Sequence, residues 1–308
     1  MPLISLPPGK RRSLLRYGLL ALLLSNGFIA SIGNAQSKIY KYTDENGKLV
    51  FTDKKPKQAA ETIQLKTRGN QSKHEPWLET IRENGKHRLF LNNPVHAPIQ
   101  FLYRASRLGK KRFQFSAEGP GRFLLHEQDS SFGELKSGWA IGKGDVVHSQ
   151  SVYDLPFSSK KRLLISQGFN GRFSHQGIGN RNALDIAMEV GTHIAAARPG
   201  IVAIAKDDYH MGGAKSFFLD KANHITVYHD DGSSAIYAHI LQGSAKVKPG
   251  DKVRAGQVIA RAGSSGYSTG PHLHFVIRGI MGGRVASLPF RLRGRDGKTF
   301  RPMAGQKI

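Results

Sequence analysis

Apolar and polar residues alternate with a period of two along most of this sequence, and this pattern predicts strands rather than helices. In the C-terminal half, Gly, Asp and Asn turns separate short apolar runs, and no run shows the 3.6-residue period of an amphipathic helix. These runs cover residues 202–205, 224–228, 234–237, 252–253, 258–260 and 274–277. Residues 155–308 are therefore predicted to form one mainly β domain that ends in a basic tail.

The middle of the chain repeats this alternation, and turn residues again separate the runs. The runs cover residues 88–91, 99–103, 112–115 and 122–125. This spacing predicts a small antiparallel β-sandwich-like domain over residues 87–154.

Two β-prone arms flank Asn46-Gly47, a pair favoured in tight hairpins. A short β-hairpin module is therefore expected over residues 36–66. Residues 67–86 are polar and charged, and we expect them to be a linker.

The first residues of the chain have the pattern of a secretory signal. Four basic residues precede an apolar run from Tyr17 to Ile32, and Gly33-Asn-Ala35 follows with the small residues that a signal peptidase requires. The run is interrupted at residues 25–27, so it is short for a membrane span of ~20 residues. Residues 1–35 are expected to be a signal peptide. The mature chain should then be periplasmic or secreted, with no membrane span.

Composition narrows the chemistry. The chain has no cysteine, which excludes disulfides, thiolate metal sites and cysteine nucleophiles. The formal net charge is +24, or +20 without the four basic residues of the leader, and such a surplus attracts polyanions. In an exported protein these would be anionic envelope polymers or lipopolysaccharide, and charge alone does not distinguish the two. No RNA-binding or helix-turn-helix pattern is present, so nucleic acid is not an expected partner.

Histidine and aspartate at strand ends are the candidate chemistry. His272 and His274 lie two residues apart in a predicted strand, so both rings share one face. Asp185 lies between Leu184 and Ile186, and burying its carboxylate unpaired would be costly. It therefore needs a cation, a hydrogen-bond network or solvent.

Four ordered blocks in the C-terminal half resemble the lysostaphin/LytM-type zinc endopeptidases of peptidoglycan. The blocks are Gly168-Phe-Asn-Gly-Arg-Phe-Ser-His175, Ala183-Leu-Asp-Ile-Ala187, Ile236-Tyr-Ala-His239 and Ser268-Thr-Gly-Pro-His-Leu-His-Phe275. Between the last two, residues 247–259 are similar to the glycine-punctuated connecting segment of that family.

The resemblance implies an antiparallel β-groove that holds Zn²⁺ and cleaves peptide bonds in peptidoglycan stems or cross-links. It also implies that His175, Asp185 and His274 bind the zinc and that His239 and His272 are the unligated catalytic pair. The hairpin module resembles a short module of unknown function that often follows the signal peptide in Gram-negative envelope proteins.

Two features bear on this expectation. The commonest family pattern has three residues between the first His and the Asp, whereas nine separate His175 from Asp185, and the shorter spacing falls on Arg181, which cannot be a ligand. Relatives that have lost ligands bind and activate other cell-wall hydrolases, so a non-catalytic activator is the alternative function. The complete set of five residues favours the enzyme.

Lone histidines outside this set are expected to be surface or hydrogen-bonded core residues. Among them, His229 precedes Asp230-Asp-Gly232 and is expected to lie in an exposed turn.

Overall fold

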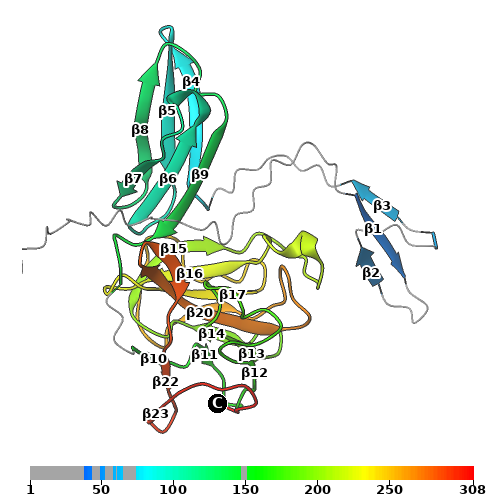
Figure 1. Ribbon diagram of the computed structural model, residues 1–308. Helices are drawn as coiled ribbons and strands as arrows, with labels where there is room; N and C mark the ends of the chain where they lie inside the picture. Colours follow the sequence, from blue (N-terminus) through cyan, green and yellow to red (C-terminus); the bar gives the residue numbers. More distant parts are fainter. Residues whose placement is uncertain (1–37, 44–48, 53–57, 60, 65–73, 147–150) are drawn as a thin grey trace, which may run out of the picture.

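The computed structural model describes residues 38–43, 49–52, 58–59, 61–64, 74–146 and 151–308. These residues form strands and turns almost throughout, so the prediction of a mainly β chain is confirmed (Figure 1). Within this described part, no helix has the length and apolar character needed to cross a membrane. The predicted signal peptide (residues 1–35) and the Asn46-Gly47 pair lie outside the described residues.

The first described residues form a three-stranded antiparallel sheet in the order β2-β1-β3. Its strands are β1 (Lys38–Thr43), β2 (Leu49–Thr52) and β3 (Glu61–Gln64). The two arms that flank Asn46-Gly47 pair with each other, with Tyr42 opposite Val50. The third strand, β3, was not anticipated, because its four residues contain only one large apolar side chain.

Two three-stranded antiparallel sheets then share one hydrophobic core. One has the order β4-β5-β8, and its strands are β4 (Trp77–Glu83), β5 (Lys86–Asn93) and β8 (Gly121–Gln128). The other has the order β7-β6-β9, and its strands are β7 (Phe113–Ala117), β6 (Ile99–Ala105) and β9 (Leu135–Ile141). A short 3₁₀ turn, η1 (Ser106–Leu108), follows β6. Alternate residues of β6 are buried, as its sequence pattern predicts.

Strand β4 lies inside residues 67–86, so the expectation of a linker there was wrong for residues 77–83. Its charged residues point to solvent, where Glu79 pairs with Arg122 at 3.0 Å. They made the segment look unstructured in the sequence. The missed signal was Asn84-Gly85, which turns β4 into β5 with φ of 51° and 79°. Positive φ at both central residues is what an Asn-Gly hairpin turn provides.

The C-terminal half is built on an eight-stranded antiparallel sheet with the order β12-β13-β20-β17-β16-β15-β18, to which β21 adds by pairing with β20. Its strands are β12 (Ile165–Gln167), β13 (Ala183–Ala187), β15 (Gly200–Lys206), β16 (His224–Tyr228), β17 (Ser234–Ala238), β18 (Lys252–Val253), β20 (His272–Met281) and β21 (Arg284–Ser287). A 3₁₀ turn, η2 (Ser216–Phe218), lies between β15 and β16.

Two small sheets complete this half, in the orders β11-β14-β19 and β10-β22-β23. Their strands are β10 (Val152–Asp154), β11 (Phe157–Ser158), β14 (His193–Ala195), β19 (Val258–Arg261), β22 (Arg291–Arg293) and β23 (Thr299–Phe300).

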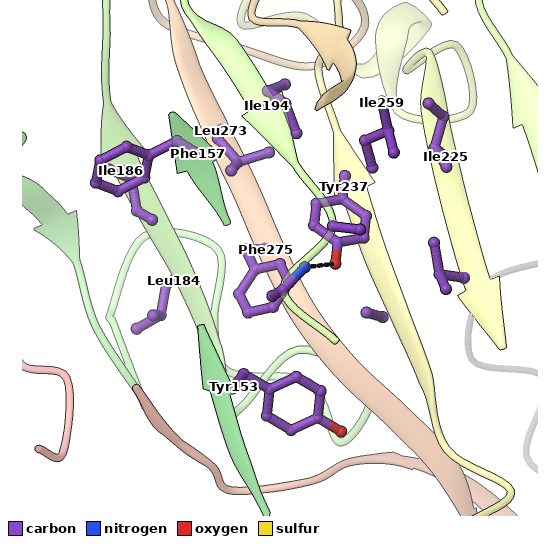
Figure 2. Packing of buried hydrophobic residues seen from close by; sticks show 14 of the residues in the cluster. Tyr153, Phe157, Leu184, Ile186, Ile194, Ile225, Tyr237, Ile259, Leu273 and Phe275 are labelled. Carbon is purple, nitrogen blue, oxygen red and sulfur yellow. Dashed lines mark hydrogen bonds between the residues drawn. The ribbon is translucent and has the colours of Figure 1, made fainter. Parts of the chain in front are cut away.

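A single core fills the space between the large sheet and these small sheets. Figure 2 shows Tyr237 and Phe275 side by side in it, with ring centroids 5.1 Å apart. The hydroxyl of Tyr237 is fully buried but satisfied, because it accepts a hydrogen bond of 2.7 Å from the backbone N–H of Ala197. Burying aromatic rings with their polar ends paired stabilises the sheet that carries the site.

The sandwich does not close its core alone. Ala203 and Ile204 of β15 belong to the same buried cluster as Leu89 and Phe101 of the sandwich. The backbone N–H of His96 also donates to the carbonyl of Ala203 at 3.1 Å. The two halves therefore pack together along β15, as Figure 1 shows.

Candidate metal centre

The site begins as a row of residues across four neighbouring strands. Gln167 on β12 lies opposite Asp185 on β13, Asp185 lies opposite His274 on β20, and His274 lies opposite Ala238 on β17. Directly opposed residues of antiparallel strands share a face of the sheet. Leu184 and Ile186, which flank Asp185, are fully buried on the other face, as the alternation requires. The aspartate is thus held toward the site by the packing of its neighbours.

Three of the predicted residues meet at one point. The Asp185 Oδ1 atom is 3.2 Å from His175 Nε2 and 2.8 Å from His274 Nδ1. One potential ligand atom from each of these residues lies within 4.8 Å of the other two. His175, Asp185 and His274 come from a loop and two strands, so only the folded chain brings them together.

Asp185 is buried, with only 12% of its side chain exposed. Burial by itself would raise the pKa of Asp185, but the hydrogen bonds and charges of His175 and His274 lower this pKa well below its usual range. The site is therefore built around a fixed negative charge.

The orientation of His175 is set by its own loop. Its ring is fully buried, and its Nδ1 lies 2.9 Å from the carbonyl oxygen of Gly168. A carbonyl can only accept, so Nδ1 donates to it, and this bond turns Nε2 toward Asp185. The backbone N–H of His175 donates to Gly171 at 3.0 Å, and Asn170 takes a positive φ of 56° in the turn.

The long segment between His175 and Asp185 is anchored to β20 and β21. Arg278 of β20 donates from Nε to the carbonyl of Gly179 at 2.8 Å and from Nη2 to Asn180 Oδ1 at 2.6 Å. Ser287 of β21 donates from Oγ to the carbonyl of Ile178 at 2.9 Å. The residues between His175 and Asp185 therefore form a loop that is held against the β20–β21 hairpin and re-enters the sheet before Asp185. This is how nine intervening residues still leave His175 beside Asp185.

His239 and His272 stand next to this group, with ring centroids 4.5 Å apart. Nδ1 of His239 donates to the carbonyl of Ser265 at 2.7 Å, and Nδ1 of His272 donates to the carbonyl of Gly270 at 2.8 Å. Each ring therefore keeps Nε2 available. His272 Nε2 lies 3.8 Å from Asp185 Oδ1, outside hydrogen-bond distance.

The backbone at His239 is unusual, because φ is 65° at a residue other than glycine. Such a conformation is uncommon, and here it ends β17 and turns the ring toward the site. Burial and the nearby His272 and His274 lower the pKa of His239 to about 3, so the ring is neutral at pH 7. A neutral imidazole with a free Nε2 can accept a proton.

Gln167 also belongs to the site, although nothing in its local sequence pointed to it. Its Nε2 donates to Asp185 Oδ2 at 2.7 Å and to Ser174 Oγ at 2.7 Å. Its Oε1 accepts the backbone N–H of Phe173 at 3.0 Å. One side chain thus ties the carboxylate of Asp185 to the loop that carries His175.

The structure also shows where Arg181 and His229 lie. Arg181 is exposed, and it is not part of the cluster formed by His175, Asp185 and His274. His229 is not in an exposed turn: it is 1% exposed, its Nδ1 donates to the carbonyl of Pro199 at 2.7 Å, and its ring packs against Tyr153. Within the described part of the chain its Nε2 has no hydrogen-bond partner. The acidic turn that follows it is exposed in part, but the ring points inward.

Comparison with known families gives two matches. Residues 179–287 match peptidase family M23, and this segment contains Asp185, His239, His272 and His274. It begins after His175. Residues 21–76 match DUF4124, a domain of unknown function.

Curated relatives that match part of the chain include two endopeptidases. The glycyl-glycine endopeptidase ALE-1 of Staphylococcus capitis is 39% identical over 98 residues, which are 32% of this chain and 24% of the relative. The peptidoglycan DD-endopeptidase ShyA of Vibrio cholerae is 31% identical over 129 residues, which are 40% of this chain and 27% of the relative. The chain therefore matches less than a third of the length of either relative.

Among solved structures, the catalytic domain of the prophage-encoded M23 protein EnpA from Enterococcus faecalis is 28% identical. The match covers 44% of this chain and 92% of that chain, with a TM-score of 0.32.

Proposed function

We propose, from the match of residues 179–287 to peptidase family M23, that the protein is a zinc endopeptidase that hydrolyses peptide bonds in peptidoglycan. The observation that carries the proposal is the convergence of His175, Asp185 and His274, whose ligand atoms lie within 4.8 Å of one another. Two further imidazoles with free Nε2 atoms stand beside them.

The donor set fits zinc. Two imidazole nitrogens and one carboxylate oxygen are a common catalytic zinc set, and they leave one coordination position open. The carbonyl of Gly168 orients the ring of His175, and Gln167 orients the carboxylate of Asp185. Metal ligands in proteins usually have such hydrogen-bond partners behind them. When bound, the metal would lower the pKa of a water toward ~7 and polarise the scissile carbonyl.

The chain itself would supply the proton transfers. His239 and His272 are the pair that takes the proton from the attacking water and returns a proton to the leaving amine. Their carbonyl partners hold both Nε2 atoms on the site side, so no rotation of either ring is required. The dependence of kcat/KM on pH, measured for variants that lack His239 or His272, would assign the two transfers to the two rings.

The substrate assignment rests on the relatives, because ShyA is named as a peptidoglycan DD-endopeptidase. The proposed location is outside the cytoplasm, in the periplasm or beyond, where peptidoglycan lies. A formal net charge of +24 would help to hold the protein on anionic envelope polymers. The presence of all three proposed ligands and both histidines together favours the enzyme over the alternative of a non-catalytic activator.

The test is mass spectrometry of purified peptidoglycan sacculi after incubation with the mature protein, with and without a zinc chelator. We expect new peptide amino termini that disappear with chelator and with His175→Ala. His193→Ala is the matched control, because His193 is an exposed histidine on β14. Intact sacculi after incubation with folded, zinc-loaded protein would refute the enzyme and leave the activator.

A further inference from the structure

The C-terminal segment of the chain is part of the wall next to the metal centre. Beyond β23 it returns to the sheet and pairs with the segment that contains β12: Gly305 N–H donates to Ile165 at 2.9 Å, and Ile165 N–H donates to Gln306 at 2.9 Å. Leu163 and Ile308 exchange two more backbone hydrogen bonds. Figure 1 shows this segment beside β12. It is a fixed element of the fold, held by backbone pairing.

A pocket of about 550 Å³ opens between this segment and the loop that carries His175. Gln167 and Gly168 form its wall toward the metal centre. These two residues also contact the ligands, because Gln167 donates to Asp185 and the Gly168 carbonyl accepts from His175. A Cβ at Gly168 would lie 2.9 Å from the backbone nitrogen of Ala304, so only glycine allows the segment to approach this closely. The pocket and the metal centre thus share a wall.

The charge of the pocket is positive. Arg172 and Arg301 line it from opposite sides, and no Asp or Glu is among the lining residues. Both arginines are exposed, and neither guanidinium has an ion pair or a hydrogen bond within the described ranges of the chain. Two cations without an acidic partner in one concavity favour an anionic ligand, and a guanidinium fits a carboxylate with two parallel hydrogen bonds.

Apolar surface surrounds these charges. Phe173 is 66% exposed and Met303 is 62% exposed, which makes them two of the three most exposed large apolar side chains in the described residues. The ring of Phe173 also stacks on Tyr267, with 6.2 Å between the ring centroids. Exposed apolar side chains around convergent polar groups are typical of a binding site.

We propose that this pocket is a specificity subsite that binds a free carboxylate of the peptide substrate, on the β12 side of the scissile bond. The inference rests on the proposed endopeptidase function. Arg172 and Arg301 bind the carboxylate, and Phe173 and Met303 contact the aliphatic part of the residue that carries it. Stem peptides of peptidoglycan carry free carboxylates on short aliphatic residues, so the chemistry of the pocket matches that class of substrate.

The experiment measures cleavage of two soluble compounds by the mature protein, that is, by the whole chain after the expected signal peptide. One is a cross-linked pair of stem peptides with free carboxylates, and the other is the same compound with those carboxylates amidated, which removes the charges. We expect kcat/KM to be about tenfold or more higher for the free acid, the ratio that one charge-assisted hydrogen bond supplies. In the Arg172→Gln/Arg301→Gln double variant this ratio should fall toward one.

Lys307→Gln is the matched control, since it removes a positive charge from the same C-terminal segment but Lys307 does not line the pocket. Its acid-to-amide ratio should equal that of the unmodified protein. Calorimetric binding of both compounds to chelator-treated protein is measured in parallel, because the pocket does not require the metal.

The outcomes separate the two proposals. Cleavage of both compounds at equal rates would overturn the subsite and leave the endopeptidase standing. Tighter binding of the free acid without any cleavage would support the subsite and refute the endopeptidase. An acid-to-amide ratio that survives in the double variant would also overturn the subsite, because the discrimination would then come from elsewhere.

Discussion

Replacing Gln167 by methionine is expected to weaken metal binding by about 10- to 100-fold. Methionine keeps the length of the side chain but removes the amide, so it deletes the 2.7 Å hydrogen bond to Asp185 Oδ2 and the bonds to Ser174 and Phe173. A hydrogen bond to a charged group contributes about 1.5–3 kcal/mol, which converts to roughly the same range in affinity. The carboxylate of Asp185 would be less restrained, and so would the loop that carries His175.

The assay is a competition for zinc between the protein and a chromogenic chelator. Gln257→Met is the control, because Gln257 is a partly buried glutamine whose Oε1 accepts the backbone N–H of Arg254 at 3.1 Å in the turn between β18 and β19. Melting of the chelator-treated proteins separates a local effect from a loss of fold. Affinities of Gln167→Met and the control that agree within roughly threefold would refute the reasoning, since that is below 1 kcal/mol.

Three further changes test other parts of the structure. Arg278→Met removes the two hydrogen bonds that hold the loop between His175 and Asp185 at Gly179 and Asn180. Zinc affinity should fall about tenfold, while the melting temperature of the chelator-treated protein changes little. An unchanged affinity would contradict the anchoring role. Gly266→Ala should lower the free energy of unfolding by about 2 kcal/mol or more, because φ is 77° and the new Cβ would lie 2.5 Å from Ala222 atoms. Urea titration measures this loss, and a stability equal to that of the unmodified protein would contradict the packing. Burial lowers the pKa of His229 to about 4, below the ~6.5 of the unfolded chain. The contribution of the neutral ring to the free energy of unfolding is therefore complete above pH 6.5 and falls by up to about 3 kcal/mol toward pH 4. His229→Gln should flatten the dependence of unfolding free energy on pH in that window, and an unaltered slope would show that His229 does not titrate as described.

The residues that were predictable from sequence are those whose placement follows from alternation within one strand. Asp185 between two core residues, and His272 and His274 two apart, can occupy only one face once the strand is assigned. His239 follows from its position at the end of β17. The family resemblance supplied the roles that these positions alone do not determine.

What the sequence did not reveal depends on contacts between segments far apart in the chain. Gln167 has no pattern of its own, and its importance comes from lying opposite Asp185 after β12 and β13 pair. Arg278 looks like an ordinary strand residue until the loop between His175 and Asp185 packs against β20. His229 was misjudged because the acidic turn beside it is polar, whereas the direction of its ring is decided by packing against Tyr153. Strand β4 was missed because the charges on its exposed side dominate its composition.

The shared core along β15 has a consequence for spectroscopy. The chain has two tryptophans, Trp77 and Trp139, and both lie in the sandwich, whereas every proposed zinc ligand lies in the other half. If Ala203 and Ile204 make the sandwich depend on the large sheet, heat should unfold both halves in one cooperative transition. The intrinsic fluorescence of the sandwich would then report zinc binding at a site it never touches, as a rise in its own melting temperature.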